Sequence, residues 1–170
     1  MHGIPPNGFL LGINMKKLVM VMAGVFALTL WHVGCSSPPR ISRQAKLHIV
    51  SSPRLNLDEN GYAHPVEVRI YFLRSHGVFA SRKSLELWEN DEAILTQDLI
   101  WKNQITVFPS RDNTMILPTR ALARAGYLGI VANYIKPRLN QNKDVFALHQ
   151  GQNFTLKLEP RHLSLEANIR

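Results

Sequence analysis

Cysteine is almost absent from this chain: Cys35 is the only one among 170 residues. An intramolecular disulfide is therefore impossible, which excludes the class of small secreted scaffolds held together by disulfides. Short catalytic signatures are missing too, because the sequence contains no Gly-x-Ser-x-Gly elbow, no phosphate-binding glycine loop and no His-Glu-x-x-His pair. We therefore predict that the chain is not an enzyme, holds no cofactor and takes no small-molecule substrate.

Spacing typical of metal ligands is also missing. The histidines after Cys35 stand singly along the chain, so we predict no metal site; they are His48, His64, His76, His149 and His162. Two acidic pairs, Asp58-Glu59 and Asp91-Glu92, consist of sequence neighbours, whose side chains would face opposite ways on a strand. We interpret both pairs as solvated surface charge.

Long runs of one charge are absent. The chain has 20 Lys and Arg against 12 Asp and Glu, a formal net charge of +8 at pH 7, but no four basic residues stand in a row. Aromatic residues do not alternate with basic clusters, as a groove for single-stranded nucleic acid requires. We therefore predict no nucleic-acid partner and interpret the positive charge as mostly solvated.

A hydrophobic run long enough for a stable membrane span is absent, but a shorter one follows the basic pair Lys16-Lys17. A helix over residues 18–31 would rise about 21 Å, less than the roughly 30 Å of a bilayer's hydrocarbon core. A basic start, a short apolar stretch and a small residue before Cys35 are typical of a signal peptide. We predict that residues 1–34 are removed and that Cys35 carries a covalent lipid. A plain signal peptide or a short membrane anchor with an incidental cysteine is the alternative.

The residues around Cys35 refine this prediction. His32 stands where the lipid-attachment motif usually has Leu, while Val33 and Gly34 fit the motif. An Asp directly after the cysteine would argue for retention in the inner membrane, and this chain has Ser36. We therefore expect the chain to be lipid-anchored at the periplasmic face of the outer membrane.

Two further segments flank the lipid-attachment motif. Residues 1–14 precede a signal peptide that is already complete from Met15, so Met15 is the expected start and Met1 the alternative. Residues 35–45 are polar and contain proline, as expected of a lipidated tether between membrane and domain.

Residues 46–166 form the predicted folded domain, in which apolar residues recur mostly with a period of two. The pattern is clearest in Val66–Phe72, where every second residue is Val, Ile or Phe. The same pattern predicts strands over Lys46–Ser51, Gln104–Phe108, Thr114–Leu117, Tyr127–Tyr134, Phe154–Leu158 and Leu163–Leu165. So many short strands predict a mainly β fold, an antiparallel β-sandwich.

Two short helices are expected beside these strands. Ser81 can cap a helix over Arg82–Asn90, in which Leu85 and Trp88 would lie on one face. A second helical piece is expected around Thr119–Ala125. We expect both helices to cover an end or an edge of the sandwich.

The connection between the first two strands, residues 51–65, is too long for a hairpin. It carries turn-forming residues together with the apolar Leu55, Leu57 and Tyr62. Long ordered loops on a rigid sheet are a usual place for recognition. The alternative is a loop that tucks these apolar side chains onto its own sandwich.

Several sequence blocks, in this order behind a lipid-attachment motif, resemble the outer-membrane lipoprotein family of the type VI secretion system, TssJ. The blocks are Leu55–Asp58 with Gly61, Pro65–Tyr71, Phe79 with Leu85 and Leu87, Asp98-Leu99, Phe108-Pro109 and Tyr127–Tyr134. The resemblance implies a transthyretin-like sandwich that binds the periplasmic C-terminal region of the inner-membrane protein TssM. Through TssM, it implies attachment to the TssL–TssM inner-membrane complex.

The resemblance also implies a partner-binding loop, which coincides with the long first connection. Carried over to this chain, the candidate partner-binding residues are Leu55, Asn56, Leu57, Asp58, Asn60, Gly61 and Tyr62. Two other functions stay open: a periplasmic lipoprotein that binds carbohydrate or peptidoglycan, and an enzyme on a transthyretin-like fold. The C-terminal residues Ala167–Arg170 do not match the tyrosine-containing C-terminus of the hydrolases of that fold.

Overall fold

The computed structural model of this chain describes residues 45–148 and 153–168. The predicted signal peptide, Cys35 and all but the end of the predicted tether lie outside the described residues, as does His149. No helix in the described part of the chain is long and apolar enough to cross a membrane.

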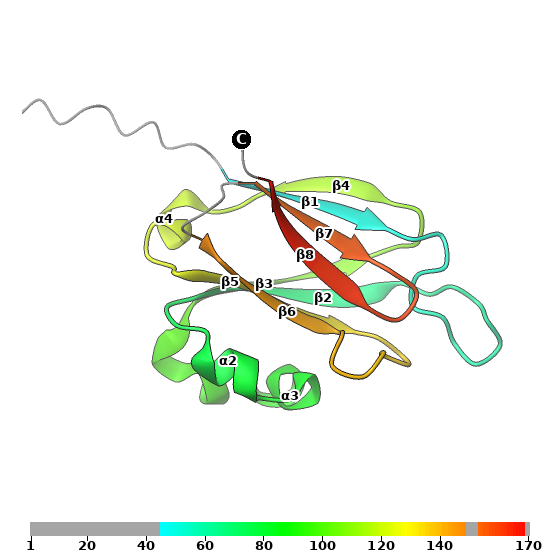
Figure 1. Cartoon of the computed structure of the whole chain (residues 1–170), viewed down its shortest axis with the longest axis horizontal. Coiled ribbons are helices and arrows are strands. Elements are labelled where there is room, and N and C mark those ends of the chain that lie inside the picture. Colours follow the sequence, from blue (N-terminus) through cyan, green and yellow to red (C-terminus); the bar gives the residue numbers. More distant parts are fainter. Residues whose placement is uncertain (1–44, 149–152, 169–170) are drawn as a thin grey trace, which may run out of the picture. The chain divides into compact units, whose positions relative to one another are not determined.

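Two four-stranded sheets make up the domain, as the sequence predicts for a β-sandwich (Figure 1). One sheet has the order β4-β1-β7-β8 and contains β4 (Asp112–Ile116), β1 (Lys46–Ser51), β7 (Asn153–Leu158) and β8 (Leu163–Asn168). The other has the order β3-β2-β5-β6 and contains β3 (Leu99–Val107), β2 (Val66–Leu73), β5 (Tyr127–Asn133) and β6 (Lys143–Ala147). The mainly β, transthyretin-like architecture is therefore confirmed. One pair departs from the antiparallel expectation, because β1 runs parallel to β7.

Some strand boundaries differ from the sequence prediction. β3 begins at Leu99 rather than near Gln104, because it pairs with β2 along its whole length. β4 begins at Asp112 rather than at Thr114, since Asp112 and Asn113 pair with the end of β1. β6 was not predicted, because none of its residues is fully buried or fully exposed and its sequence carries no alternation.

The main core lies between the two sheets and is built by the period of two. The alternate residues of β2 from Val66 to Phe72 face it, together with those of β5, β7 and β8. Tyr71 and Leu73 point to the other side of the same sheet and belong to a second cluster with Phe79, Leu87 and Leu95. β2 is thus buried on both faces, which requires a cover over its outer face.

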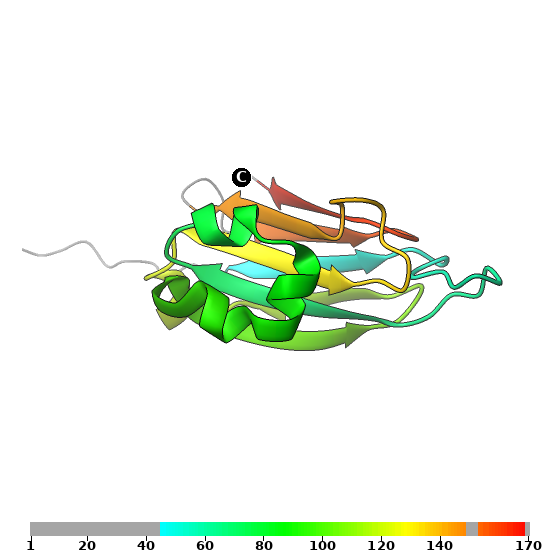
Figure 2. The same cartoon turned by 90° about the horizontal axis from the view of Figure 1, so that it is seen from below.

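Helices α2 (Gly77–Ser81) and α3 (Ser84–Leu95) supply that cover, and Figure 2 shows them lying across the β3-β2-β5-β6 sheet. A short 3-10 helix, η2 (Thr96–Asp98), leads from α3 into β3, and α4 (Thr119–Leu122) precedes β5. The expected position at an end or an edge is therefore wrong for the first predicted helix. α3 begins without a side-chain cap after Lys83, while Ser81 ends α2 and donates its hydroxyl to the carbonyl of Val78 at 2.9 Å.

The face predicted for this helix is right for Trp88, which packs half-buried against the second cluster, and wrong for Leu85. Leu85 is 64% exposed, whereas Leu87 is fully buried against the sheet. The buried residues of the helix are Leu87, Asp91 and Leu95. They are four positions apart and so lie on one face, where the charged Asp91 stands between two leucines. The predicted face therefore omits Leu87, Asp91 and Leu95, the most deeply buried residues of α3.

Candidate partner-binding surface

The loop between β1 and β2 is fastened at its base by Asn56. The amide of Asn56 donates from Nδ2 to the carbonyl of Pro65 at 2.7 Å, and its Oδ1 accepts from the backbone N–H of Ile135 at 2.7 Å. Asn56 adopts a positive φ of 50°, a conformation that asparagine tolerates better than most residues. One buried side chain therefore closes the loop on itself and joins it to the β5–β6 connection.

The tip of the same loop is organised by Asp58. Its Oδ1 accepts from the backbone N–H groups of Asn60 and Tyr62, both at 2.9 Å, and its Oδ2 lies 3.1 Å from Nε2 of His64. The hydrogen bond with His64 holds the pKa of Asp58 below its ordinary value, against partial desolvation, and the two backbone bonds act in the same direction. Gly61 completes the turn at a φ of 83°. The carboxylate thus holds an exposed turn in one shape.

The seven predicted partner-binding residues divide into two groups. Leu55, Asn56 and Leu57 are buried, so the alternative of a loop tucked onto its own sandwich describes this part. Asn60, Gly61 and Tyr62 are exposed and Asp58 is half-buried, with 69% of Tyr62 accessible. The first group fixes the loop, and the second presents side chains to the surroundings.

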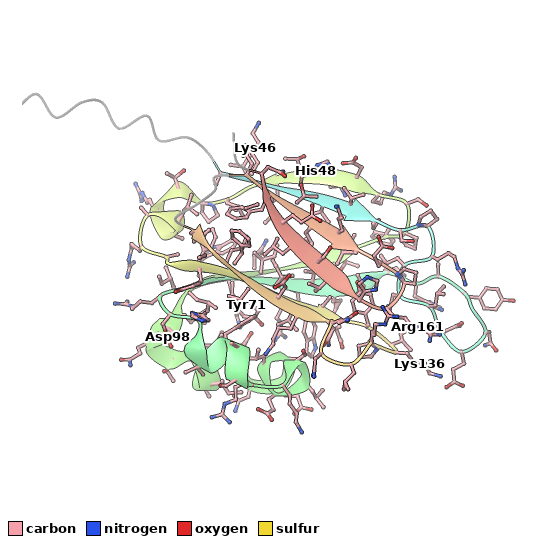
Figure 3. The ribbon with its side chains drawn as sticks, viewed as in Figure 1. Lys46, His48, Tyr71, Asp98, Lys136 and Arg161 are labelled. Atoms are coloured by element: carbon pink, nitrogen blue, oxygen red, sulfur yellow. The ribbon has the colours of Figure 1, made fainter. Side chains whose placement is uncertain are left out.

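Two other connections lie beside this loop. Lys136, from the β5–β6 connection, places Nζ 2.6 Å from Oε1 of Glu59. The N–H of Leu57 donates to the carbonyl of Pro160 in the β7–β8 turn at 3.3 Å. Figure 3 shows Lys136 and Arg161 of these two connections at the same end of the sandwich. We call residues 52–65, 134–142 and 159–162 together the loop end.

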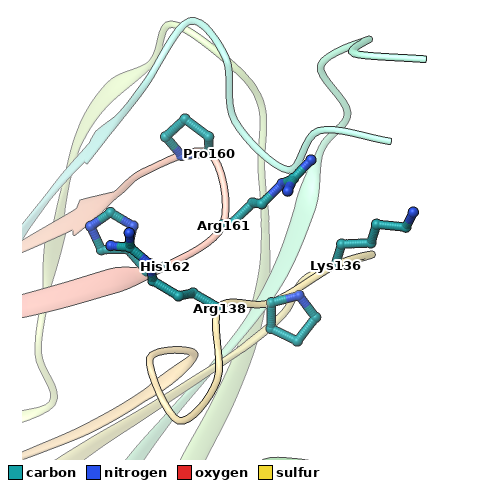
Figure 4. Close-up of a pocket in the computed structure, with 6 residues that line it drawn as sticks. Lys136, Arg138, Pro160, Arg161 and His162 are labelled. Carbon is teal, nitrogen blue, oxygen red and sulfur yellow. The ribbon is translucent and has the colours of Figure 1, made fainter. Parts of the chain in front are cut away.

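A basic hollow of about 410 Å³ opens in the loop end (Figure 4). It is lined by Lys136, Pro137, Arg138, Pro160, Arg161 and His162. Sequence reasoning missed it, because residues 136–138 and 160–162 are far apart in the chain and were interpreted as scattered surface charge. The available signal was two of the chain's four Pro-Arg steps, Pro137-Arg138 and Pro160-Arg161, each between two predicted strands.

Exposed apolar side chains accompany this basic hollow. Ile135 is 51% exposed and Leu139 is 84% exposed, on the same connection that supplies Lys136 and Arg138. With Tyr62, they give the loop end large apolar groups among charged ones. Surfaces of this composition are typical of protein–protein contacts.

A second polar cluster lies under α3 and centres on Asp91, which is only 4% exposed. Its Oδ2 accepts from Tyr71 Oη at 2.9 Å and Arg69 Nη1 at 3.1 Å, and its Oδ1 accepts from Lys102 Nζ at 3.1 Å. The interpretation of Asp91 as solvated charge is therefore wrong. Arg69 and Tyr71, which donate two of these hydrogen bonds, are outward-facing residues of β2. From the sequence alone, residues on this side of the strand are expected to face solvent.

The electrostatics of this cluster fix its protonation. Burial by itself raises the pKa of Asp91, but the hydrogen bonds from Lys102 and Tyr71 and the charges of Lys102 and Arg69 outweigh it, so the pKa lies below its ordinary value. Burial and the neighbouring carboxylate raise the pKa of Tyr71, which stays a hydroxyl donor. The Arg69 guanidinium also stacks on Trp88 at 4.2 Å. The side chains of Asp91, Arg69, Tyr71 and Lys102 are thus held by hydrogen bonds to one another.

The described residues offer few other places for ligand chemistry. Among them, no buried side-chain nitrogen or oxygen lacks a hydrogen bond, and no group of three metal-ligand side chains occurs. Trp101 packs on Phe72 at a ring separation of 5.2 Å, and Trp88 is covered by Arg69. Neither tryptophan lies open in a groove, as a carbohydrate site would favour.

The fold and this surface define a class, a two-sheet β-sandwich domain with a hydrogen-bonded loop between its first two strands. A family model described as "Type VI secretion lipoprotein, VasD, EvfM, TssJ, VC_A0113" matches residues 43–167, and the chain belongs to this family of membrane-bound type VI secretion lipoproteins. No curated protein matches the chain by sequence.

Solved structures agree on the fold. The type VI secretion lipoprotein TssJ1 from Pseudomonas aeruginosa is 19% identical with a TM-score of 0.66, covering 75% of this chain and 98% of that one. Lip from Serratia marcescens, a membrane-bound component of the type VI secretion system, is 15% identical with a TM-score of 0.60, covering 71% and 95%. A chain in a structure described as the TssM C-terminal domain (869–1107) from EAEC is 22% identical with a TM-score of 0.64, covering 72% and 99%.

Proposed function

We propose that this lipoprotein is anchored through lipid on Cys35 to the periplasmic face of the outer membrane and binds the periplasmic C-terminal region of TssM. By that contact it tethers the TssL–TssM inner-membrane complex to the outer membrane. The loop between β1 and β2 makes the contact, through Asp58, Asn60, Gly61 and Tyr62. In this role the chain is a structural component and carries out no catalysis.

The observation that supports this proposal is the state of the loop tip. Tyr62 is 69% exposed although Asp58 holds the backbone beneath it by hydrogen bonds at 2.9 Å. An exposed aromatic side chain on a fixed turn loses little conformational entropy on binding, which favours affinity. Leu55 packs in the core between the sheets, and the N–H of Leu57 donates to the carbonyl of Pro160, so the same loop is held against the sandwich.

Binding to TssM can be measured with Tyr62→Ala. We expect its Kd for the periplasmic region of TssM to rise about tenfold or more, as for an aromatic side chain at the centre of an interface. Leu85→Ala is the matched control, because Leu85 is exposed to a similar extent, 64%, but lies on α3. Unchanged binding by Tyr62→Ala would assign the contact to another surface.

Anchoring is tested separately through Cys35. We expect radiolabelled palmitate to be incorporated into the wild-type chain and not into Cys35→Ser, with the variant lost from the outer-membrane fraction. Absence of label in the wild type would remove the lipid from the proposal without affecting the TssM contact.

A further inference from the structure

We infer that the loop end binds an acidic segment of the protein partner: Tyr62, Ile135 and Leu139 provide apolar contact, and the basic hollow receives a carboxylate. This inference rests on the proposed function and adds to it the chemistry of the partner. It also extends the contact beyond the β1–β2 loop to the β5–β6 connection and the β7–β8 turn.

The hollow is formed before any ligand arrives. The backbone N–H of Arg138 donates to the carbonyl of Arg161 at 2.7 Å, which joins the β5–β6 connection to the β7–β8 turn. The hydroxyl of the buried Tyr134 donates to the carbonyl of His162 at 2.7 Å, and the backbone N–H of Leu163 donates to the carbonyl of Gln141 at 2.8 Å. Walls fixed by backbone bonds need little ordering when a ligand binds.

The charge of the hollow selects an anion. Its lining holds Lys136, Arg138, Arg161 and His162 and includes no carboxylate. Lys136 is neutralised by Glu59 at 2.6 Å, and Glu159 adjoins the turn without lining the hollow. Within the described residues Arg138 and Arg161 form no salt bridge, so their guanidinium groups remain available to a carboxylate, which they can bind in a bidentate manner.

The apolar surroundings favour a protein as the source of that carboxylate. Leu139 and Ile135 are 84% and 51% exposed, and Tyr62 is 69% exposed across the loop end. Cell-wall polymers also carry carboxylates, but they offer little that would cover aliphatic side chains. A protein segment with an acidic residue beside apolar ones matches both parts of the surface.

The test compares two double charge reversals in the full lipidated chain, purified from solubilised membranes and measured against full-length TssM. Arg138→Glu/Arg161→Glu changes the hollow. Arg120→Glu/Arg124→Glu is the matched control, because these exposed arginines lie at and just after α4, away from the loop end (Figure 1). Both variants must keep the wild-type thermal unfolding midpoint.

We expect the hollow variant to raise the Kd for TssM at least about tenfold and the control to change it less than about twofold. Wild-type binding should weaken as salt increases, and the hollow variant should show a smaller salt dependence. Ile135→Ser/Leu139→Ser should weaken binding without changing the salt dependence, because it removes apolar contact only.

Three results would overturn the inference. If the hollow variant binds TssM like the control while Tyr62→Ala does not, the proposed function stands and the carboxylate subsite is wrong. If the hollow variant loses binding to isolated peptidoglycan sacculi but not to TssM, the occupant is the cell wall. If the wild-type chain does not bind TssM at all, the proposed function and this inference fail together.

Discussion

The cluster under α3 and the hollow at the loop end both gather arginine and lysine, yet the two regions treat charge in opposite ways. Under α3, Arg69 and Lys102 both bind the buried carboxylate of Asp91 at 3.1 Å. At the loop end, Arg138 and Arg161 line an open hollow without a carboxylate in its lining. The first arrangement satisfies its charges within the chain, and the second leaves them for a ligand.

The difference follows from the cost of burial. A charge enclosed by protein must be paired and hydrogen-bonded, because desolvation otherwise costs several kcal/mol. An exposed guanidinium stays hydrated and contributes little to stability. We therefore expect substitutions under α3 to change the free energy of unfolding, and substitutions at the loop end to change binding.

Asp91→Ala should have the largest effect on stability. The substitution removes the acceptor that Tyr71, Arg69 and Lys102 share, while Lys102 keeps Glu92 at 2.7 Å and Arg69 keeps the carbonyl of Trp88 at 2.8 Å. We expect a loss of about 3 kcal/mol, the upper end for a hydrogen bond to a charged group. Urea-induced unfolding followed by tryptophan fluorescence measures this, because Trp88 lies against Arg69 in the same cluster.

Asp91→Asn is the control for that prediction. It keeps the shape and one acceptor oxygen but removes the charge, so its loss should be smaller. If Asp91→Ala destabilises the chain by less than about 1 kcal/mol, within the range of ordinary single substitutions, the cluster does not hold α3 to the sheet.

Asn56→Ala should have the next largest effect, about 2 kcal/mol, because it leaves the carbonyl of Pro65 and the N–H of Ile135 without their partners. Asn56→Ala should affect binding as well as stability, because a looser β1–β2 loop should weaken the contact with TssM. Asn56→Gly removes the same hydrogen bonds but accepts the positive φ of 50° without strain, so it separates the side-chain contribution from the backbone one. Equal stability of Asn56→Ala and wild type in urea would contradict the prediction.

Acid should weaken the cluster under α3 by protonating Asp91. The folded-state pKa of Asp91 lies below its ordinary value of 3.8, so its stabilising effect is fully present above about pH 4. This effect is lost as the pH falls through the lower folded-state value. The free energy of unfolding of the wild type should therefore fall more steeply with acid than that of Asp91→Asn. The pKa of Asp58 is also lowered, so Asp58→Asn measures its separate contribution to the acid dependence. If the free energy of unfolding of wild type and of Asp91→Asn fell equally with acid, the assignment to Asp91 would be contradicted.

Much of the fold could be predicted from sequence because burial on one face leaves a period of two. β7 and the first half of β2 show that period clearly, while β5 is buried on both faces; the predicted inward residues of all three strands are buried. β6 shows no such period, since each of its residues is half-buried. The direction of the β1–β7 pair depends on which distant strands meet, which no local pattern encodes.

The candidate surface was predicted less completely than the fold. The unusual length of the β1–β2 connection drew attention to Tyr62. The backbone of Leu57, however, is held by a hydrogen bond to the carbonyl of Pro160, more than a hundred residues later in the 170-residue chain. The basic hollow and the cluster at Asp91 both arise from residues on separate elements. Their charges were interpreted as solvated, because sequence distance does not show which side chains the fold brings together.

Tyr62→Phe should have the smallest effect on stability, a change in unfolding free energy within about 0.5 kcal/mol, as is usual for an exposed side chain. Tyr71→Phe is its counterpart on the buried side, because it deletes a hydroxyl that donates to the Asp91 carboxylate at 2.9 Å. A hydrogen bond to a charged group contributes about 1.5–3 kcal/mol, so the same chemical change should be clearly destabilising there. Paired urea titrations of the two variants measure the contrast directly. If Tyr62→Phe proved as destabilising as Tyr71→Phe, the hydroxyl of Tyr62 at the loop tip would contribute to folding stability. The distinction between the buried cluster and the exposed loop end would then fail.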